Sequence, residues 1–131
     1  MSPSGIRRRA FPVLYVSNVR RSVAFYTKLG YEQVYQFPLE GDPHYVGLEL
    51  GGESSLGIAD YNWPEAQLGV TVGTAPRFEL FVYVEDVEAE VAKMREAGYE
   101  IMQAPANMPW GERQAYVADP DRNPVALATP I

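Results

Sequence analysis

An internal repeat is the sequence feature that most constrains how this chain folds. Segment 13–34, VLYVSNVRRSVAFYTKLGYEQV, aligns without a gap with segment 81–102, FVYVEDVEAEVAKMREAGYEIM. One copy cannot bury the apolar face of its own sheet, so we expect two similar modules that pack or pair. The matching positions are Tyr15 with Tyr83, Val16 with Val84, Val19 with Val87, Val23 with Val91, Ala24 with Ala92, Gly30 with Gly98, Tyr31 with Tyr99 and Glu32 with Glu100.

Each copy predicts a strand, a helix and the start of a second strand. A polar helix start, Ser17-Asn18 or Glu85-Asp86, follows the first strand, and about three helical turns come after it. Gly30 and Gly98 end the two helices, because glycine adopts the left-handed conformation at a helix end without steric cost. The first helix has an apolar face at helical spacing, formed by Val19, Val23, Tyr26 and Leu29.

Two modules of β-α-β-β-β order follow from this pattern, one over residues 11–60 and one over residues 78–130. We expect them to form a single α+β domain over residues 11–131. The elements of the first module are strand Phe11–Val16, helix Val19–Leu29 and strands Tyr31–Phe37, His44–Leu50 and Ser54–Asp60. Those of the second are strand Phe78–Val84, helix Val87–Ala97 and strands Tyr99–Ala104, Arg113–Ala118 and Val125–Ala128.

Two segments outside the modules have their own character. Residues 1–10 combine small residues with three adjacent arginines, which predicts a flexible basic arm. Residues 61–77 mix aromatic residues with proline and glycine and lack helical periodicity, so we expect a linker without regular structure. Long connectors of this kind often line binding sites, which makes Tyr61 and Trp63 candidates.

Composition limits the class of protein. A chain of 131 residues with 47% hydrophobic and 12% aromatic residues is long and apolar enough to form a core. Cysteine is absent, which excludes disulfides, thiolate nucleophiles and cysteine-ligated metals. No apolar run approaches the length of a membrane span, and no run of signal-peptide length follows the basic arm. We therefore expect a cytoplasmic protein without a membrane partner.

The charge is distributed unevenly. All 17 acidic residues lie at Glu32 or beyond, where only five of the 11 basic residues lie: Arg77, Lys93, Arg95, Arg113 and Arg122. Such a body repels a phosphate backbone, which argues against nucleic acid as a partner, and it attracts cationic ligands. The alternative interpretation is that the acidic residues only keep a small protein soluble.

The two modules, with ADPDRNPVAL before the last strand, resemble the vicinal-oxygen-chelate (glyoxalase/bleomycin-resistance) superfamily over roughly residues 10 to 130. The resemblance implies a curved mixed sheet with a ligand cleft. It also places the four metal-ligand positions of metal-dependent members at Phe11, Gly57, Glu79 and Ala126, of which only Glu79 has a donor side chain. The one histidine, His44, lies on a different strand. Its simplest interpretation is a partly exposed residue at the end of that strand. We therefore expect no metal and no cofactor, and neither glyoxalase I nor extradiol dioxygenase activity.

The motif Pro109-Trp110-Gly111 is similar to that of the bleomycin-resistance branch, whose members bind drugs without a metal. In that branch the tryptophan stacks on planar drug rings opposite an aromatic residue of the third strand, which corresponds to Tyr45. Proline in the first strand lacks an amide donor, so Pro12 belongs at an edge, a bulge or a crossing between subunits. The resemblance favours the crossing, and with it a strand-swapped homodimer. Arg122 departs from the glycine usual in the DPDGN turn, and the linker residues Tyr61, Trp63 and Pro64 have no aligned counterpart in that branch, so the ligand need not be bleomycin itself.

Our hypothesis from the sequence is that the protein sequesters a small aromatic natural product or antibiotic, such as a bleomycin-, enediyne- or mitomycin-like compound, and so gives resistance. Aromatic faces suit this role because offset stacking gives affinity without matched hydrogen bonds. The candidate ligand-binding residues are Trp110, Tyr45, Glu79, Trp63, Gly111, Phe37, Tyr61 and Tyr116.

Two alternative functions remain open at this point. The first is a metal-free lyase or isomerase of the same fold that uses Glu79 with a tyrosine, Tyr83 or Tyr116. The second is a regulatory ligand-binding module. Glu79 itself either marks the solvent end of its strand or points into the ligand cavity.

Overall fold

The computed structural model describes residues 11–74 and 76–131. The chain divides between Val72 and Gly73 into two compact units, which we call unit 1 and unit 2. The division falls inside the predicted linker 61–77. The predicted basic arm, residues 1–10, lies outside the described residues.

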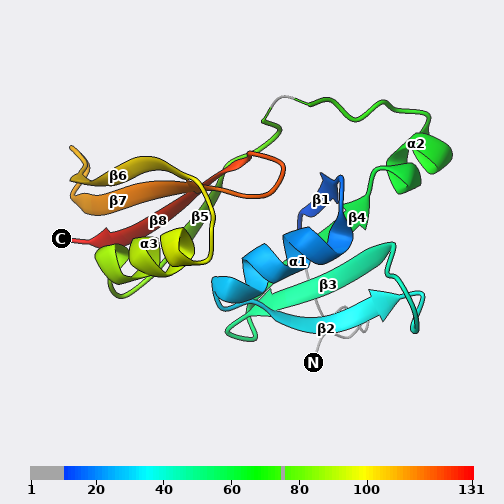
Figure 1. Ribbon diagram of the computed structural model, residues 1–131, viewed down its shortest axis with the longest axis horizontal. Coiled ribbons are helices and arrows are strands. Elements are labelled where there is room, and N and C mark those ends of the chain that lie inside the picture. The colour runs from blue at the N-terminus through cyan, green and yellow to red at the C-terminus, as the bar shows by residue number, and fades with distance from the viewer. Residues whose placement is uncertain (1–10, 75) are drawn as a thin grey trace, which may run out of the picture. The chain divides into compact units, whose positions relative to one another are not determined.

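Unit 1 contains a four-stranded mixed sheet with the strand order β1-β4-β3-β2. Its strands are β1 (Val13–Val16), β2 (Glu32–Phe37), β3 (Tyr45–Leu50) and β4 (Ser54–Asp60). β1 is parallel to β4, whereas β4, β3 and β2 are antiparallel neighbours. Helix α1 (Val19–Lys28) packs on this sheet (Figure 1).

Unit 2 repeats the arrangement with the strand order β5-β8-β7-β6. Its strands are β5 (Leu80–Tyr83), β6 (Ile101–Asn107), β7 (Glu112–Ala118) and β8 (Pro124–Pro130), and helix α3 (Val87–Glu96) packs on them. Both units contain one parallel strand pair. β1 pairs with β4, with Val13 opposite Gly57, and β5 pairs with β8, with Phe81 opposite Ala126. The predicted α+β class and the mixed strand directions are therefore confirmed. In the part of the chain described, however, each unit has its own sheet, whereas the prediction was one continuous curved sheet.

The repeated helix starts have the same local cause in both units. Asn18 and Asp86 have extended backbones, and their Oδ1 atoms accept hydrogen bonds from the N–H groups of Arg21 and Ala89, each at 3.0 Å. Such side-chain acceptors satisfy donors that have no partner within the helix. Each helix is followed by a glycine with positive φ, which ends the turn as predicted.

The core of unit 1 lies between α1 and one face of its sheet. Alternate strand residues point to this face and are buried, and they contact the helix side that carries Phe25 and Tyr26, both fully buried. The sequence reading included Tyr26 in the apolar face but missed Phe25. The buried strand residues are Leu14, Val16, Val46, Leu48, Leu56 and Ile58. Helix α1 does not cover the other face of the sheet, and this face carries Phe37 and Tyr45.

The prediction of an unstructured linker over residues 61–77 is wrong for its first part, which forms helix α2 (Asn62–Leu68). Asp60 Oδ1 accepts hydrogen bonds from the N–H groups of Asn62 (3.0 Å) and Trp63 (3.3 Å) at the helix start. Pro64 is tolerated because it lies in the first turn, where a backbone N–H has no helical partner. Gly69, in the left-handed conformation, ends the helix.

Several strand boundaries also differ from the predictions. The first strand of each unit is shorter than expected: β1 begins at Val13, and β5 covers only Leu80–Tyr83. β6 and β8 run further, to Asn107 and Pro130. Pro12 precedes β1, and its carbonyl accepts a hydrogen bond from the N–H of Gly57 at 2.9 Å. β1 is an edge strand, which fits the lack of an amide donor at Pro12.

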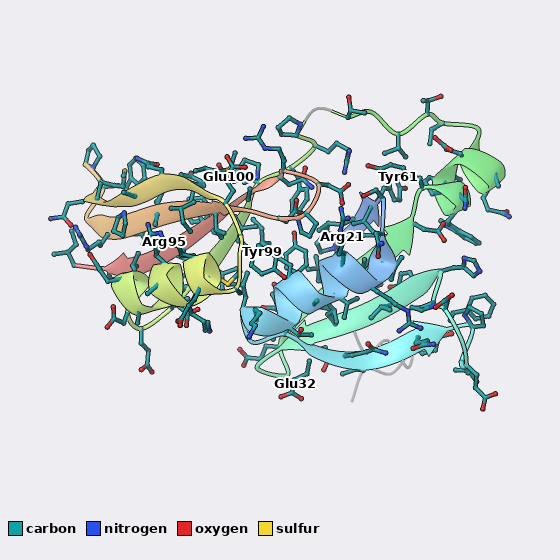
Figure 2. All side chains as sticks on the ribbon, in the orientation of Figure 1. Arg21, Glu32, Tyr61, Arg95, Tyr99 and Glu100 are labelled. Carbon is teal, nitrogen blue, oxygen red and sulfur yellow. The ribbon has the colours of Figure 1, made fainter. Side chains whose placement is uncertain are left out.

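The turn before β8 is organised by two buried polar residues, Asp119 and Asn123. Asp119 Oδ1 accepts hydrogen bonds from the N–H groups of Asp121 (2.9 Å) and Asn123 (2.8 Å), and both Asp119 oxygens accept from Asn123 Nδ2. Arg122 adopts a left-handed backbone with φ 62°, where glycine would fit without strain. Its guanidinium pairs with Glu100, labelled in Figure 2, at 3.0 Å.

None of the helices within residues 11–74 and 76–131 has the length and apolar character that a membrane span requires.

Candidate functional site

A pocket of about 570 Å³ opens on the face of the unit 1 sheet that α1 does not cover. It lies within the 300–1,000 Å³ range typical of sites for small molecules, and its wall is mostly apolar. Its lining residues come from β1, β2, β3, β4 and α2, together with His44 just before β3. They are Val13, Tyr35, Phe37, His44, Tyr45, Ala59, Asp60, Asn62, Trp63, Ala66 and Gln67.

The strand register explains why aromatic rings gather on this face. Phe37 lies opposite Tyr45, and Tyr45 lies opposite Ala59, so the three share one side of the sheet. The rings of Tyr35 and Tyr45 are 6.2 Å apart between centroids and tilted. Tyr45 is large and its cross-strand neighbour Ala59 is small, so the sheet surface is lower at Ala59. Both residues line the pocket.

Gly57 makes room for one of these rings. A Cβ atom built at position 57 would lie 2.7 Å from the Tyr45 hydroxyl oxygen and 3.0 Å from Tyr45 Cε1. The Tyr45 ring therefore occupies space that any side chain at position 57 would need. Gly57 is one of the positions that the family resemblance assigned to a metal ligand, and in this protein that position has no side chain.

Gly57→Ala is therefore expected to destabilise the protein by about 1–3 kcal/mol, the usual cost of overpacking, and to displace the Tyr45 ring. Thermal unfolding and aromatic-probe binding measure the two effects. Gly73→Ala is the matched control, because a Cβ there meets nothing within 4 Å and its melting temperature should stay unchanged. A Gly57→Ala protein with unchanged melting and binding would show that the Tyr45 ring moves aside freely.

The short helix α2 supplies the remaining wall. Trp63, Ala66 and Gln67 recur at the spacing of one helix face, and all three line the pocket. The Trp63 side chain is 55% exposed, so its indole is open to solvent and to a guest. Tyr61 lies at the junction of β4 and α2 (Figure 2) and is not among the lining residues.

The mouth of the pocket holds the one histidine of the chain, His44, in contact with Asp60. His44 Nδ1 lies 2.8 Å from Asp60 Oδ2, and the backbone N–H of Asp60 donates to the His44 carbonyl at 3.0 Å. The imidazole is largely exposed, whereas the carboxylate is mostly buried. Sequence reasoning treated His44 as an isolated strand-end residue and did not consider Asp60, so this pair was missed.

The open face of unit 2 carries a second aromatic group, built around Glu112. Tyr83 donates its hydroxyl hydrogen to Glu112 Oε2 (2.8 Å), and Trp110 Nε1–H donates to Glu112 Oε1 (3.0 Å). The hydrogen bond to Glu112 raises the pKa of the Tyr83 phenol above its ordinary value, because the carboxylate prefers the protonated hydroxyl. Trp110 is 61% exposed.

The enzyme alternative pairs Glu79 with either Tyr83 or Tyr116, and Glu79 acts on the second of these. Burial raises the pKa of Tyr116, the hydrogen bond and charge of Glu79 raise it further, and a hydrogen bond from Gln114 opposes the change. Tyr116 is protonated at neutral pH, as an ordinary phenol is, and can donate a hydrogen bond. The neighbouring Gln114 is buried, and its Oε1 atom has no hydrogen-bond partner.

The structure thus divides the predicted ligand-binding residues between two places. Phe37, Tyr45 and Trp63 line one pocket in unit 1. Trp110, Glu79 and Tyr116 belong to unit 2, with Gly111, which has a φ of 91° and lies in the turn before β7. The assignment of these residues to ligand binding stays a prediction.

The residues at the four metal positions of the superfamily do not fit a metal. Phe11, Gly57 and Ala126 have no donor side chain, and Glu79 interacts with Tyr116. Over residues 11–74 and 76–131, no three His, Cys, Asp or Glu side chains converge as a metal site requires.

Comparison with known proteins agrees with this architecture. A hypothetical protein from S. aureus is 22% identical, with 96% of each chain covered and a TM-score of 0.78. TioX from Micromonospora sp. ML1 is 19% identical over 95% of this chain and 100% of that one, with a TM-score of 0.77. A glyoxalase/bleomycin resistance protein from Streptomyces sp. CB03234 is 27% identical over 93% of this chain and 100% of that one, with a TM-score of 0.68.

The first two of these likenesses show the fold alone. No curated protein matches the sequence. The family model of the Glyoxalase/Bleomycin resistance protein/Dioxygenase superfamily matches residues 9–127, which is most of the chain and includes both modules. The chain therefore belongs to the glyoxalase/bleomycin resistance protein/dioxygenase superfamily.

Proposed function

We propose that this protein is a cytoplasmic, metal-independent binding protein that sequesters a small aromatic natural product and so protects its host. The observation that carries the proposal is the unit 1 pocket, where the rings of Tyr35, Phe37, Tyr45 and Trp63 line one apolar hollow. Its volume of about 570 Å³ suits a drug-sized guest. The 27% identity to a Streptomyces glyoxalase/bleomycin resistance protein supports the resistance role.

The lining favours binding over chemistry. Rings that are exposed before a guest arrives offer stacking partners whose burial stabilises the complex. The polar groups of the pocket are few compared with its apolar wall, so they orient a guest without surrounding it. The net charge of −6 further favours a cationic guest over an anionic one.

Tryptophan fluorescence tests this proposal, because the chain has only two tryptophans, Trp63 and Trp110. In a Trp110→Phe variant, Trp63 is the single reporter and reads the unit 1 pocket alone. Proflavine, a planar aromatic cation, should quench it saturably at one molecule per chain, and anthracene-2-carboxylate, a planar anion, should bind more weakly. Mass spectrometry should recover both probes unchanged. Binding of neither probe would contradict the proposal.

A second candidate function is a metal-free lyase or isomerase, favoured by the effect of the Glu79 carboxylate on the pKa of Tyr116. Glu79 would accept a proton and Tyr116 would donate one. This enzyme would convert many substrate molecules per chain, and both Glu79→Gln and Tyr116→Phe would abolish turnover. A binding protein gives no turnover with either the parent chain or the variants.

We also propose that the protein is a homodimer. β1 is the edge strand of the unit 1 sheet in the part of the chain described, and Phe11, shortly before it, and Val13, its first residue, are exposed large apolar residues. Sedimentation at micromolar concentration should give the mass of a dimer, since a closed two-fold pairing covers such an edge. Deletion of residues 1–12 should weaken the dimer more than deletion of residues 1–10. Monomers in the parent protein would refute the proposal.

A further inference from the structure

The geometry points to His44 as a fixed hydrogen-bond acceptor in the lining of the unit 1 pocket. We infer that the guest of this pocket is an aromatic molecule that carries a hydrogen-bond donor, a phenolic O–H or a heteroaromatic N–H, on the edge of its ring. This inference rests on the proposed binding function and narrows it to a chemical class of ligand.

Asp60 determines which imidazole nitrogen carries the hydrogen. Its Oδ1 accepts from the backbone N–H groups of Asn62 and Trp63, and these bonds hold the carboxylate in place. Its Oδ2 lies 2.8 Å from His44 Nδ1. A carboxylate that already accepts two N–H groups presents an acceptor to the imidazole, so Nδ1 carries the hydrogen. The other ring nitrogen, Nε2, is then left as an acceptor.

The position of the pair makes this acceptor available to a guest. His44 and Asp60 both line the pocket, and the His44 side chain is 64% exposed. The pair joins separate elements, because His44 precedes β3 whereas Asp60 is the last residue of β4 and accepts the first N–H groups of α2. The same carboxylate therefore contacts the imidazole and the start of the helix that carries Trp63, and His44 and Trp63 line one pocket.

The other polar side chains of the pocket, the amides of Asn62 and Gln67 and the phenols of Tyr35 and Tyr45, carry a donor as well as an acceptor. The remaining titratable lining groups are the phenols of Tyr35 and Tyr45, and no Lys or Arg side chain lines the pocket. A phenol both donates and accepts, whereas neutral imidazole with hydrogen on Nδ1 only accepts at Nε2. An analogue without the donor leaves Nε2 without a partner once the guest covers it, and such sites discriminate against analogues of this kind.

A matched pair of probes isolates this hydrogen bond. 2-Naphthol and 2-methoxynaphthalene have the same ring system, but only 2-naphthol donates a hydrogen bond. We expect 2-naphthol to bind roughly 3- to 10-fold more tightly, the value of one net hydrogen bond. The preference should vanish in His44→Phe, which keeps an aromatic ring but has no acceptor nitrogen.

Nitrogen NMR reads the proton position directly, because the chain has a single histidine and its two ring signals need no assignment by mutation. In the free protein, Nδ1 should have the shift of a protonated nitrogen and Nε2 that of an unprotonated one. In Asp60→Asn the side-chain NH₂ can donate to Nδ1, and the two shifts should exchange. This variant keeps an oxygen for the start of α2, so its circular dichroism should match that of the parent.

The outcomes separate this inference from the function on which it rests. Equal binding of the two probes, or a free protein with its hydrogen on Nε2, overturns the inference and leaves aromatic sequestration intact. Binding of neither probe overturns the sequestration proposal together with the inference. Preference for 2-naphthol that persists in His44→Phe assigns the acceptor to another group and also overturns the inference.

Discussion

Replacing Trp63 with alanine is expected to weaken proflavine binding about 5- to 150-fold, which corresponds to about 1–3 kcal/mol of lost stacking and apolar burial. Trp63 has the largest ring of the pocket, and it projects from α2 rather than from the sheet. Its indole is 55% exposed, so the alanine variant should melt close to the parent protein. Isothermal titration calorimetry measures the affinity without a tryptophan reporter.

Leu68→Ala is the matched control for this experiment. Leu68 is on the same helix and is an exposed large apolar residue, but it does not line the pocket. Its substitution should leave binding unchanged. Trp110→Ala separates the two aromatic groups: lost binding would show that the same guest also stacks on Trp110, whereas unchanged binding would confine the guest to unit 1. A Trp63→Ala protein that binds proflavine like the parent would remove the unit 1 pocket as the site.

Asp119→Ala is expected to lower the free energy of unfolding by about 2–4 kcal/mol. The Asp119 carboxylate is buried, and it accepts from the N–H groups of Asp121 and Asn123 and from Asn123 Nδ2. Its removal leaves these buried donors without their acceptor. Asn123 Oδ1 also accepts from the backbone N–H of Arg77 (2.9 Å), so the loss extends to the segment that leads into β5.

Asp42→Ala is the control for that measurement, because Asp42 makes an exposed ion pair with Arg20. Exposed pairs contribute about 0–1 kcal/mol, so this variant should unfold near the parent midpoint. Urea unfolding followed by circular dichroism gives both values. If Asp119→Ala and Asp42→Ala unfold at the same urea concentration, the turn is not held by Asp119.

Local sequence signals were sufficient for most of the secondary structure. The helix starts at Asn18 and Asp86 follow from a side-chain acceptor placed three residues before a free backbone N–H, which is a local property of the sequence. The Gly51-Gly52 turn made the hairpin of β3 and β4 predictable, and β4 has the predicted bounds. The partition into two sheets and the end of β6 depend on long-range pairing, which local patterns do not encode.

Helix α2 was missed because its stability comes from its surroundings. Its seven residues are too few for clear periodicity, and Pro64 ordinarily indicates a break. The helix forms because Asp60 accepts its first N–H groups and because Pro64 is buried against the rest of unit 1. Both contacts depend on where β4 ends, so a reading of residues 61–77 alone could not supply them.

The aromatic part of the pocket was predictable, but its polar part was not recognised. Phe37, Tyr45 and Trp63 were chosen for ring type and position in the chain, and all three line the hollow. The pair of His44 and Asp60 had a signal that was overlooked. In a hairpin with Gly47 opposite Gly57, position 44 comes opposite position 60, so counting along the register brings the two side chains together.

The space above Gly57 sets a limit on how this scaffold can change its chemistry. The Tyr45 hydroxyl oxygen is 2.7 Å from where a Cβ of residue 57 would lie, so a side chain at position 57 requires the Tyr45 ring to shift. A descendant or an engineered variant that gains a carboxylate ligand at position 57 must therefore move or replace the tyrosine. Aromatic recognition in unit 1 and metal coordination at that strand position compete for the same space.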